Sequence, residues 1–154
     1  MKLDATDRRI LKELQRDAGR PASEIAEIVN LSTNACWRRI KLLQEEGIIR
    51  KQVALVDAEK VDMGLTVFVE IRTSQHDEAW LERFSKGVSQ IDEVVEFHRL
   101  NGNVDYLLKI IVSSIADYDR VYKKIIRTVP LHDVTSYFSM ERIKETTEIP
   151  LDKR

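Results

Sequence analysis

The chain has 154 residues, of which 43% are hydrophobic and 33% charged, with 5 glycines and 3 prolines. This composition excludes collagen-like, low-complexity and disordered chains, and the length suits one domain or two small ones. The apolar runs are far shorter than the ~18 residues of a membrane span, and acidic residues near the N-terminus do not fit a signal peptide. We therefore expect a cytoplasmic protein that does not contact membranes.

The charge is distributed unevenly along the chain. The whole sequence has 25 basic and 26 acidic residues, but residues 1–52 hold eleven Lys and Arg against eight Asp and Glu, a net charge of +3. The remainder has a net charge of −4. A solvated helix can carry the same positive excess, so charge alone does not decide whether the first part binds nucleic acid.

A first helix is predicted over residues 5–18. Asp4 is a suitable N-cap, and Asp7 stands three residues later, where a capping box places its acid. Gly19 can adopt the left-handed conformation that ends a helix. The apolar residues of this segment recur at helical spacing, which predicts one buried face.

Two further helices follow after short breaks. Pro21 suits the first turn of a second helix that stops near Val29, and Asn30 tolerates a left-handed backbone. Ser32 can cap a third helix that ends at Gly47. A break of about three residues between the second and third helices is typical of a helix-turn-helix.

The third helix has an apolar inner stripe, formed by Cys36, Ile40 and Leu43. Its opposite face carries side chains suited to a DNA major groove: Asn can bind adenine, Arg can bind guanine, and Lys can neutralise a phosphate. The amides of the first turn can hold a phosphate as well. The residues that we expect to contact DNA are Ser32, Thr33, Asn34, Trp37, Arg38 and Lys41.

These assignments have plainer alternatives. The outward residues can form an ordinary polar helix face, with Trp37 covering a neighbouring element. Cys36 on the inner stripe is expected to be a packing residue, because a redox switch would need an exposed thiol beside cations.

The second part of the chain is predicted to alternate strands and helices. Residues 48–56 are rich in branched side chains and predict a strand that leaves the helical part, followed by a connector. A module with the order βαββαβ then forms a four-stranded antiparallel sheet with both helices on one side. Its predicted strands are 66–73, 94–100, 106–112 and 134–143, and its predicted helices are 77–88 and 115–129.

The predicted sheet has apolar residues on both faces. Phe68, for example, points away from Val67 and Val69. A bare apolar face of several hundred Å² is rare on a monomer, so we expect a second copy of the sheet to cover it. A homodimer would also carry two DNA-binding heads on one body, which multiplies their affinities.

The segments LDATDRRILKELQRD, LSTNACWRRIKLLQEEGII, LNGNVDYLLKI and SYFSMERIK together resemble the Lrp/AsnC family of transcriptional regulators, in order and over nearly the whole chain. The resemblance implies an α+β protein with a winged helix-turn-helix in residues 1–52, the motif lying at about 21–43. It further implies a connecting strand and linker in residues 53–64 and a ferredoxin-like effector and oligomerisation domain in residues 65–154. Family members bind double-stranded DNA, form homodimers that often assemble into octamers, and respond to an amino acid.

The resemblance also implies an effector site, formed by Gly102, Asp105, Tyr106 and Ser136. A carboxylate can hold the ammonium of a free amino acid, and the amides of a glycine-containing turn can hold its carboxylate. The ending of the chain is similar to a cysteine-responsive branch, and leucine and methionine are the other expected effectors. A hairpin turn with a backbone-capping aspartate explains Gly102 and Asp105 equally well.

Two other classes of function compete with a transcriptional regulator. An enzyme is disfavoured, because no Ser/His/Asp or Cys/His set, phosphate-binding loop or pair of acids stands out, and we expect no catalytic residue. His76, His98 and His132 are scattered and the chain has one cysteine, so neither a metal nor a cofactor is expected. An assembly module that docks protein rather than DNA is the second alternative. A steep dependence of DNA affinity on salt would separate it from a regulator.

Overall fold

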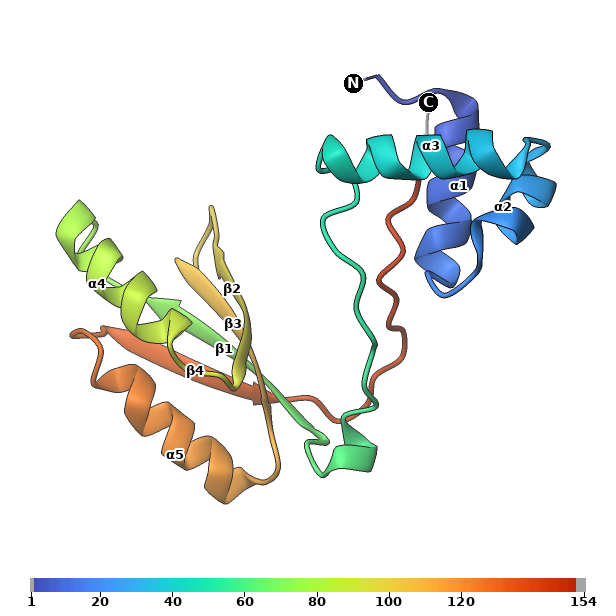
Figure 1. Cartoon of the computed structure of the whole chain (residues 1–154). Helices are drawn as coiled ribbons and strands as arrows, with labels where there is room; N and C mark the ends of the chain where they lie inside the picture. The colour runs from blue at the N-terminus through green and yellow to red at the C-terminus, as the bar shows by residue number, and fades with distance from the viewer. Residues whose placement is uncertain (1, 152–154) are drawn as a thin grey trace. The chain divides into compact units, whose positions relative to one another are not determined.

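The computed structural model describes residues 2–151, which divide into two compact units (Figure 1). The helical unit contains residues 2–55 together with residues 144–151. The sheet unit contains residues Val56–Ile143. No helix within residues 2–151 is long and apolar enough to cross a lipid bilayer.

Local hydrogen bonds define α1, the first helix of the helical unit. The Asp4 side chain accepts from the Asp7 amide at 2.7 Å, and the Asp7 side chain accepts from the Asp4 amide at 3.0 Å, which confirms the predicted capping box. The prediction for Gly19 is wrong, because its backbone is not left-handed. The helix ends instead at Asp17, whose extended backbone breaks it and whose carboxylate accepts from the Gly19 amide at 2.8 Å. The helices of this unit are α1 Ala5–Arg16, α2 Ala22–Val29 and α3 Thr33–Glu45.

The turn between α2 and α3 follows the sequence prediction. Asn30 is left-handed with a φ of 57°, and the Ser32 hydroxyl accepts from the Ala35 amide at 3.2 Å to cap α3. Gly47, with a φ of 70°, follows the end of α3. Its positive φ is the reason that glycine suits this position, since other residues adopt it at a cost.

The helical unit has its own apolar core. The C-terminal segment contributes to it through Leu151, and the Arg8 guanidinium donates to the Leu151 carbonyl at 3.2 Å. This segment therefore belongs with the helical unit, whereas the expected effector domain ran from 65 to 154. The buried residues of this core are Ile10, Leu11, Ile25, Ala26, Val29, Cys36 and Leu43.

Residues 48–56 do not form the predicted strand, and no strand is present in the connector 53–64. Ile48 and Ile49 pack against the helical core, and the Ile49 amide donates to the Leu43 carbonyl at 3.0 Å. Val53 and Leu55 are exposed. A strand requires a neighbour to receive its backbone hydrogen bonds, and the described chain offers none to this segment. A short 3₁₀ turn, Glu59–Val61, interrupts the connector.

The sheet unit has the predicted βαββαβ order. Its four strands are all antiparallel and lie in the order β2-β3-β1-β4 (Figure 1). β4 is shorter than predicted, because the Ser139 amide pairs with Thr66 at the very beginning of β1 and no partner residues continue beyond it. The elements are β1 Leu65–Arg72, α4 Glu78–Ser89, β2 Val94–Arg99, β3 Tyr106–Val112, α5 Ile115–Ile126 and β4 Asp133–Phe138.

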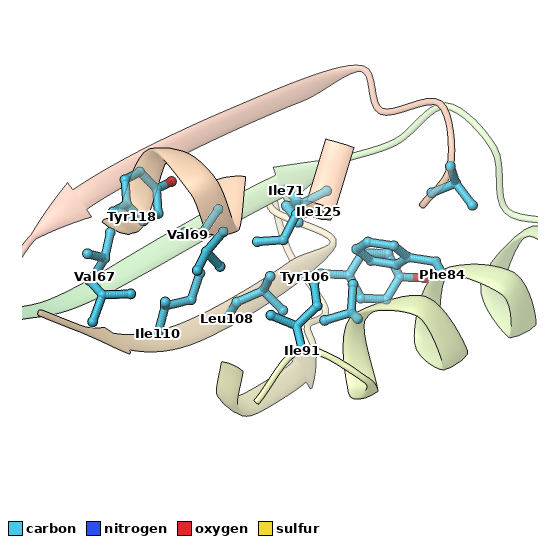
Figure 2. Packing of buried hydrophobic residues seen from close by; sticks show 14 of the residues in the cluster. Val67, Val69, Ile71, Phe84, Ile91, Tyr106, Leu108, Ile110, Tyr118 and Ile125 are labelled. Atoms are coloured by element: carbon cyan, nitrogen blue, oxygen red, sulfur yellow. The ribbon is translucent and has the colours of Figure 1, made fainter. Parts of the chain in front are cut away.

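Both helices of the sheet unit pack on the same face of the sheet. Alternate side chains of β1 are fully buried in a core that also contains Phe84 of α4: Val67 lies near Tyr118 of α5, and Ile71 lies near Ile125 of α5 (Figure 2). The opposite face is open: Phe68 is 36% exposed and Tyr137 is 50% exposed. The sheet therefore presents apolar surface away from its helices, as the alternation of the strands predicted.

Candidate functional site

The outward face of α3 carries the side chains that the sequence assigned to DNA. Trp37 is 51% exposed, and Arg38 and Lys41 are exposed beside it, whereas Cys36 and Leu43 on the other side of the helix are fully buried. Their positions follow from the 3.6-residue helical repeat, which separates the two sets by about half a turn. The predicted orientation of α3 is confirmed.

The three large side chains on this face differ in their contacts. The Lys41 ammonium lies 5.2 Å from the centroid of the Trp37 ring and 3.8 Å from a Glu45 carboxylate oxygen. Arg38 makes no hydrogen bond or ion pair with any residue in the described part of the chain. Its guanidinium is therefore available to an external acceptor, and a guanidinium can bind two acceptors at once.

The beginning of α3 is also accessible. Ser32, Thr33 and Asn34 are exposed, although the Ser32 hydroxyl already accepts the Ala35 amide as the cap. The first amides of a helix have no partner within it, and the helix dipole places partial positive charge there. This end of α3 can therefore receive an anion such as a phosphate.

A third basic side chain of α3, that of Arg39, points toward α1. Its Nη1 atom lies 2.7 Å from Asp4 Oδ2 and 2.7 Å from Asp7 Oδ1. The Asp7 side chain is only 4% exposed. The Asp7 amide and then Arg39 hold the pKa of Asp4 below its usual value, and the two carboxylates raise the pKa of Arg39. Nothing in the local sequence indicates this cluster, because the capping box explains Asp4 and Asp7 by itself.

The expected effector turn joins β2 to β3. It is closed by the Leu100 amide, which donates to the Asp105 carbonyl at 2.8 Å, and the Asp105 amide donates to the Ile71 carbonyl at 3.0 Å. The Asp105 carboxylate accepts from the Thr73 amide at 2.8 Å. Asp105 thus acts as a backbone cap, which was one of the two interpretations of this residue. Gly102 is exposed without a left-handed φ, and a Cβ added there would meet no atom within 4 Å.

The other two effector candidates lie on the helix-facing side of the sheet. Tyr106 is 4% exposed, with its ring centroid 5.2 Å from that of Phe84, and burial raises the pKa of Tyr106. The Ser136 hydroxyl is hydrogen-bonded to the Tyr118 hydroxyl of α5. The structure therefore brings Gly102, Asp105 and Tyr106 to one end of the sheet but does not place Ser136 in the same cluster.

The remaining reactive side chains have ordinary surroundings. Cys36 is fully buried, which raises the pKa of its thiol, so its position agrees with a packing role. His98 is exposed on β2 and lies 3.1 Å from a Glu96 carboxylate oxygen. No group of three or more His, Cys, Asp and Glu residues that could hold a metal ion occurs between residues 2 and 151.

Comparison with known proteins matches both parts of the chain. Residues 3–50 match a family model described as winged helix-turn-helix DNA-binding, and residues 66–149 match one described as the Lrp/AsnC ligand binding domain. The chain is 49% identical to the glutamate uptake regulatory protein of Zymomonas mobilis over 150 residues, covering 97% of this chain and 92% of that protein.

Two solved structures have the same fold. An AsnC family transcriptional regulator from Agrobacterium tumefaciens is 51% identical, with a TM-score of 0.94 over 97% of this chain and 98% of that one. A transcriptional regulator from Neisseria meningitidis in complex with L-Met is 32% identical, with a TM-score of 0.92 over 98% of each chain. These relatives are regulators, and their family is not enzymatic. The chain belongs to the Lrp/AsnC family of DNA-binding transcriptional regulators, with a DNA-binding helix-turn-helix and a separate ligand-binding domain.

Proposed function

We propose that the exposed face of α3 is the surface that reads DNA sequence in this regulator. The observation that carries the proposal is the exposed Arg38 guanidinium, which has no partner in the described part of the chain and lies on the same face as Trp37 and Lys41. An Arg side chain of this kind can bind the O6 and N7 atoms of guanine bidentately in the major groove. We therefore assign the sequence specificity of DNA binding to the Arg38 side chain.

The neighbouring residues are assigned complementary contacts. Asn34 is one helical turn before Arg38 and can bind adenine, whereas Lys41 can neutralise a phosphate. Trp37 can stack on a sugar or contact a thymine methyl group, which would cover the half of its side chain that is exposed. Ser32 and Thr33, at the beginning of α3, would receive a backbone phosphate.

The ligand-binding domain is proposed to sense a free amino acid at the turn between β2 and β3. Within residues 2–151, one Asp105 carboxylate oxygen caps the Thr73 amide, and the other has no hydrogen bond. That second oxygen can accept from the ammonium group of a ligand while the turn keeps its shape. Gly102 is exposed, and a Cβ added there would meet no atom within 4 Å, so a ligand can approach the turn from this side. Tyr106 would support the site from the helix-facing side, and Ser136, which lies on the same face but is hydrogen-bonded to Tyr118, would act at a distance from the turn.

Methionine, leucine and cysteine are the proposed effectors. The Neisseria meningitidis relative, which was solved with L-Met, supports the first of them. All three are small or medium-sized amino acids with weakly polar side chains, so the common recognition would come from the ammonium and carboxylate groups. The side chain would set the preference among them.

We further propose a homodimer that assembles into an octamer. The open face of the sheet, with Phe68 and Tyr137 exposed on it, supports the pairing, since large apolar side chains exposed on a sheet are often covered by a second subunit. Two copies of α3 on one body would then bind two half-sites of DNA, and the protein would act in the cytoplasm, on the chromosome.

The DNA-binding proposal is tested by titrating the full-length protein with duplex DNA at several salt concentrations. A regulator that neutralises several phosphates gives a steep negative slope of log affinity against log salt, and it retains a preferred sequence at high salt. A protein that docks other proteins through its helical unit gives a shallow slope and no preferred sequence, which would contradict the proposal.

A further inference from the structure

Arg39 follows Arg38 directly on α3 but does not share its surroundings. Successive residues of a helix are rotated by roughly 100° about its axis, so the two guanidinium groups leave α3 in different directions. Arg38 is exposed without a partner in the described chain, whereas the Arg39 Nη1 atom lies 2.7 Å from both Asp4 Oδ2 and Asp7 Oδ1. The Arg39 side chain is therefore engaged in ion pairs within the helical unit.

The partner of Arg39 is the beginning of α1. Asp7 is a nearly buried carboxylate, with 4% of its side chain exposed, and Arg39 is the cation in contact with it. The second Asp7 oxygen accepts the Asp4 amide, so the capping box and the ion pair share the same two carboxylates. A buried carboxylate is costly without a cation, which makes the Arg39 contact the favoured arrangement of these helices.

This contact restrains α3 in a way that apolar packing does not. The fully buried Cys36 and Leu43 hold α3 against the core, but apolar contacts have no preferred direction. The Arg39 Nη1 group donates to one carboxylate on each side, and such charge-assisted hydrogen bonds are directional. A rotation of α3 by about 10° would move an atom about 6 Å from its axis by about 1 Å. That displacement is enough to break a bidentate hydrogen bond to a base.

We propose that Arg39 is a positioning residue for DNA recognition. It fixes the rotation of α3 against α1 through Asp7 and Asp4, and it does not touch DNA. Arg38 and Asn34 then meet the base edges in a fixed register. The inference rests on the proposed role of α3 as the recognition helix and adds to it the group that sets its orientation.

A direct contact between Arg39 and a DNA phosphate would also explain a loss of affinity on substitution. The salt dependence of the affinity distinguishes such a contact from a positioning role. Loss of a phosphate contact makes the slope of log affinity against log salt shallower by about 0.9, whereas loss of a positioning contact leaves the slope unchanged. Asp7→Asn is a second way to distinguish a phosphate contact from a positioning contact. It removes a negative charge from the helical unit and would by charge alone strengthen DNA binding, so a loss of affinity in this variant has to come from geometry.

The experiment uses the full-length protein, a duplex selected from a random pool by the wild type, and a scrambled duplex. The variants are Arg39→Gln, Asp7→Asn and the double variant. Arg16→Gln is the matched control, since within residues 2–151 Arg16 pairs only with Glu13 of its own helix at 3.2 Å, and the substitution changes the net charge as Arg39→Gln does. Affinities are measured at several salt concentrations and at a temperature where circular dichroism reports folded protein.

We expect Arg39→Gln and Asp7→Asn each to lower affinity for the selected duplex at least about fivefold, with the wild-type salt slope and little change on the scrambled duplex. The double variant should be at most about twofold weaker than the weaker single variant, because both substitutions break one contact. Arg39→Lys should restore part of the affinity. Arg16→Gln should keep the preference for the selected duplex.

Two results would overturn the proposal. One is a shallower salt slope for Arg39→Gln together with unchanged or stronger binding by Asp7→Asn, which identifies Arg39 as a phosphate contact. The other is unchanged affinity for the selected duplex in both variants. If Arg39→Gln does not fold, the affinity of Asp7→Asn for the selected duplex tests the proposal by itself. Arg38→Ala, measured in parallel, distinguishes a failure of the recognition role of α3 from a failure of the positioning role of Arg39. If Arg38→Ala also leaves the affinity unchanged, the recognition role of α3 is wrong. If Arg38→Ala alone lowers the affinity, only the role of Arg39 is wrong.

Discussion

The side-chain amide of Gln15 makes two hydrogen bonds with the backbone of Ile149. Gln15 Nε2 donates to the Ile149 carbonyl at 3.1 Å, and the Ile149 amide donates to Gln15 Oε1 at 2.6 Å. Both backbone groups of one residue are thereby satisfied by one side chain of α1. Together with the Arg8 contact to Leu151, this pair holds residues 149–151 on α1 of the helical unit.

Gln15→Ala should lower the free energy of unfolding of the helical unit by about 0.5–1.5 kcal/mol. The substitution removes both hydrogen bonds, and their partial exposure keeps the cost near the value of one ordinary hydrogen bond. Gln44→Ala on α3 is the matched control, because the Gln44 side chain has no hydrogen bond within residues 2–151 and its loss should be close to neutral. Denaturant titration followed by circular dichroism measures both. Equal effects of the two substitutions would show that the Ile149 contact contributes nothing.

Gly87→Ala should destabilise the sheet unit although alanine favours a helix. A Cβ at Gly87 would lie 2.7 Å from Thr128 Cγ2, and the Thr128 hydroxyl holds that rotamer by donating to the Ile125 carbonyl at 2.7 Å. Overpacking of this kind costs about 1–3 kcal/mol, which exceeds the ~1 kcal/mol gained from helix propensity.

Gly102→Ala is the control for that prediction, since an added Cβ there meets no atom within 4 Å. Its melting temperature should stay within about 2 °C of the wild type, whereas Gly87→Ala should melt several degrees lower. A Gly87→Ala variant as stable as the wild type would mean that α4 can move away from Thr128 without cost.

Alkaline pH should destabilise the sheet unit through Tyr118. Burial raises the pKa of Tyr118 above its unfolded value near 10, and the hydrogen bond with Ser136 opposes this only in part. The unfolded chain therefore loses this proton before the folded chain does. The stabilisation is complete below pH ~10 and is lost as the pH rises toward the folded pKa. Tyr118→Phe should be less stable at neutral pH and should lose less stability between pH 9 and 11, as measured by denaturant titration at each pH. Parallel pH profiles for the two proteins would contradict this account.

A free amino acid at the β2–β3 turn should raise the melting temperature of the protein. A ligand at a hundred times its dissociation constant adds about 2.7 kcal/mol of stability, which is several degrees for a domain of this size. A thermal-shift screen of the twenty amino acids should identify methionine, leucine or cysteine, and Asp105→Asn should reduce the shift. The same ligand should alter the sedimentation coefficient if it controls assembly. No shift with any amino acid would leave Asp105 as a turn cap alone.

The features that the sequence predicted correctly depend on neighbouring residues. The Asp4–Asp7 capping box, the left-handed Asn30 and the Ser32 cap each involve residues at most three positions apart, and the buried stripe of α3 follows from helical repeat. The missed features join distant residues. Arg39 contacts Asp7 across 32 positions of the sequence, and Gln15 contacts Ile149 across 134. No local sequence pattern predicts pairs that are so far apart.

The errors in the strands have the same origin. Residues 48–56 have the branched composition of a strand, but composition does not supply the neighbour that a strand requires. β4 stops at Phe138, because β1 begins at Leu65 and offers nothing further to pair with. For the candidate site, the pattern placed Trp37 and Arg38 outside correctly. It did not foresee that the Ser136 hydroxyl would be engaged by Tyr118.

The most direct test of the central claim is the affinity of Arg38→Ala for a duplex selected by the wild-type protein, compared with its affinity for a scrambled duplex. If Arg38 reads a base from the exposed face of α3, the substitution should cost about 1–3 kcal/mol on the selected duplex, much less on the scrambled one, and relax the base preference at one position of each half-site. Unchanged affinity and unchanged base preference would contradict the assignment of this face to DNA recognition.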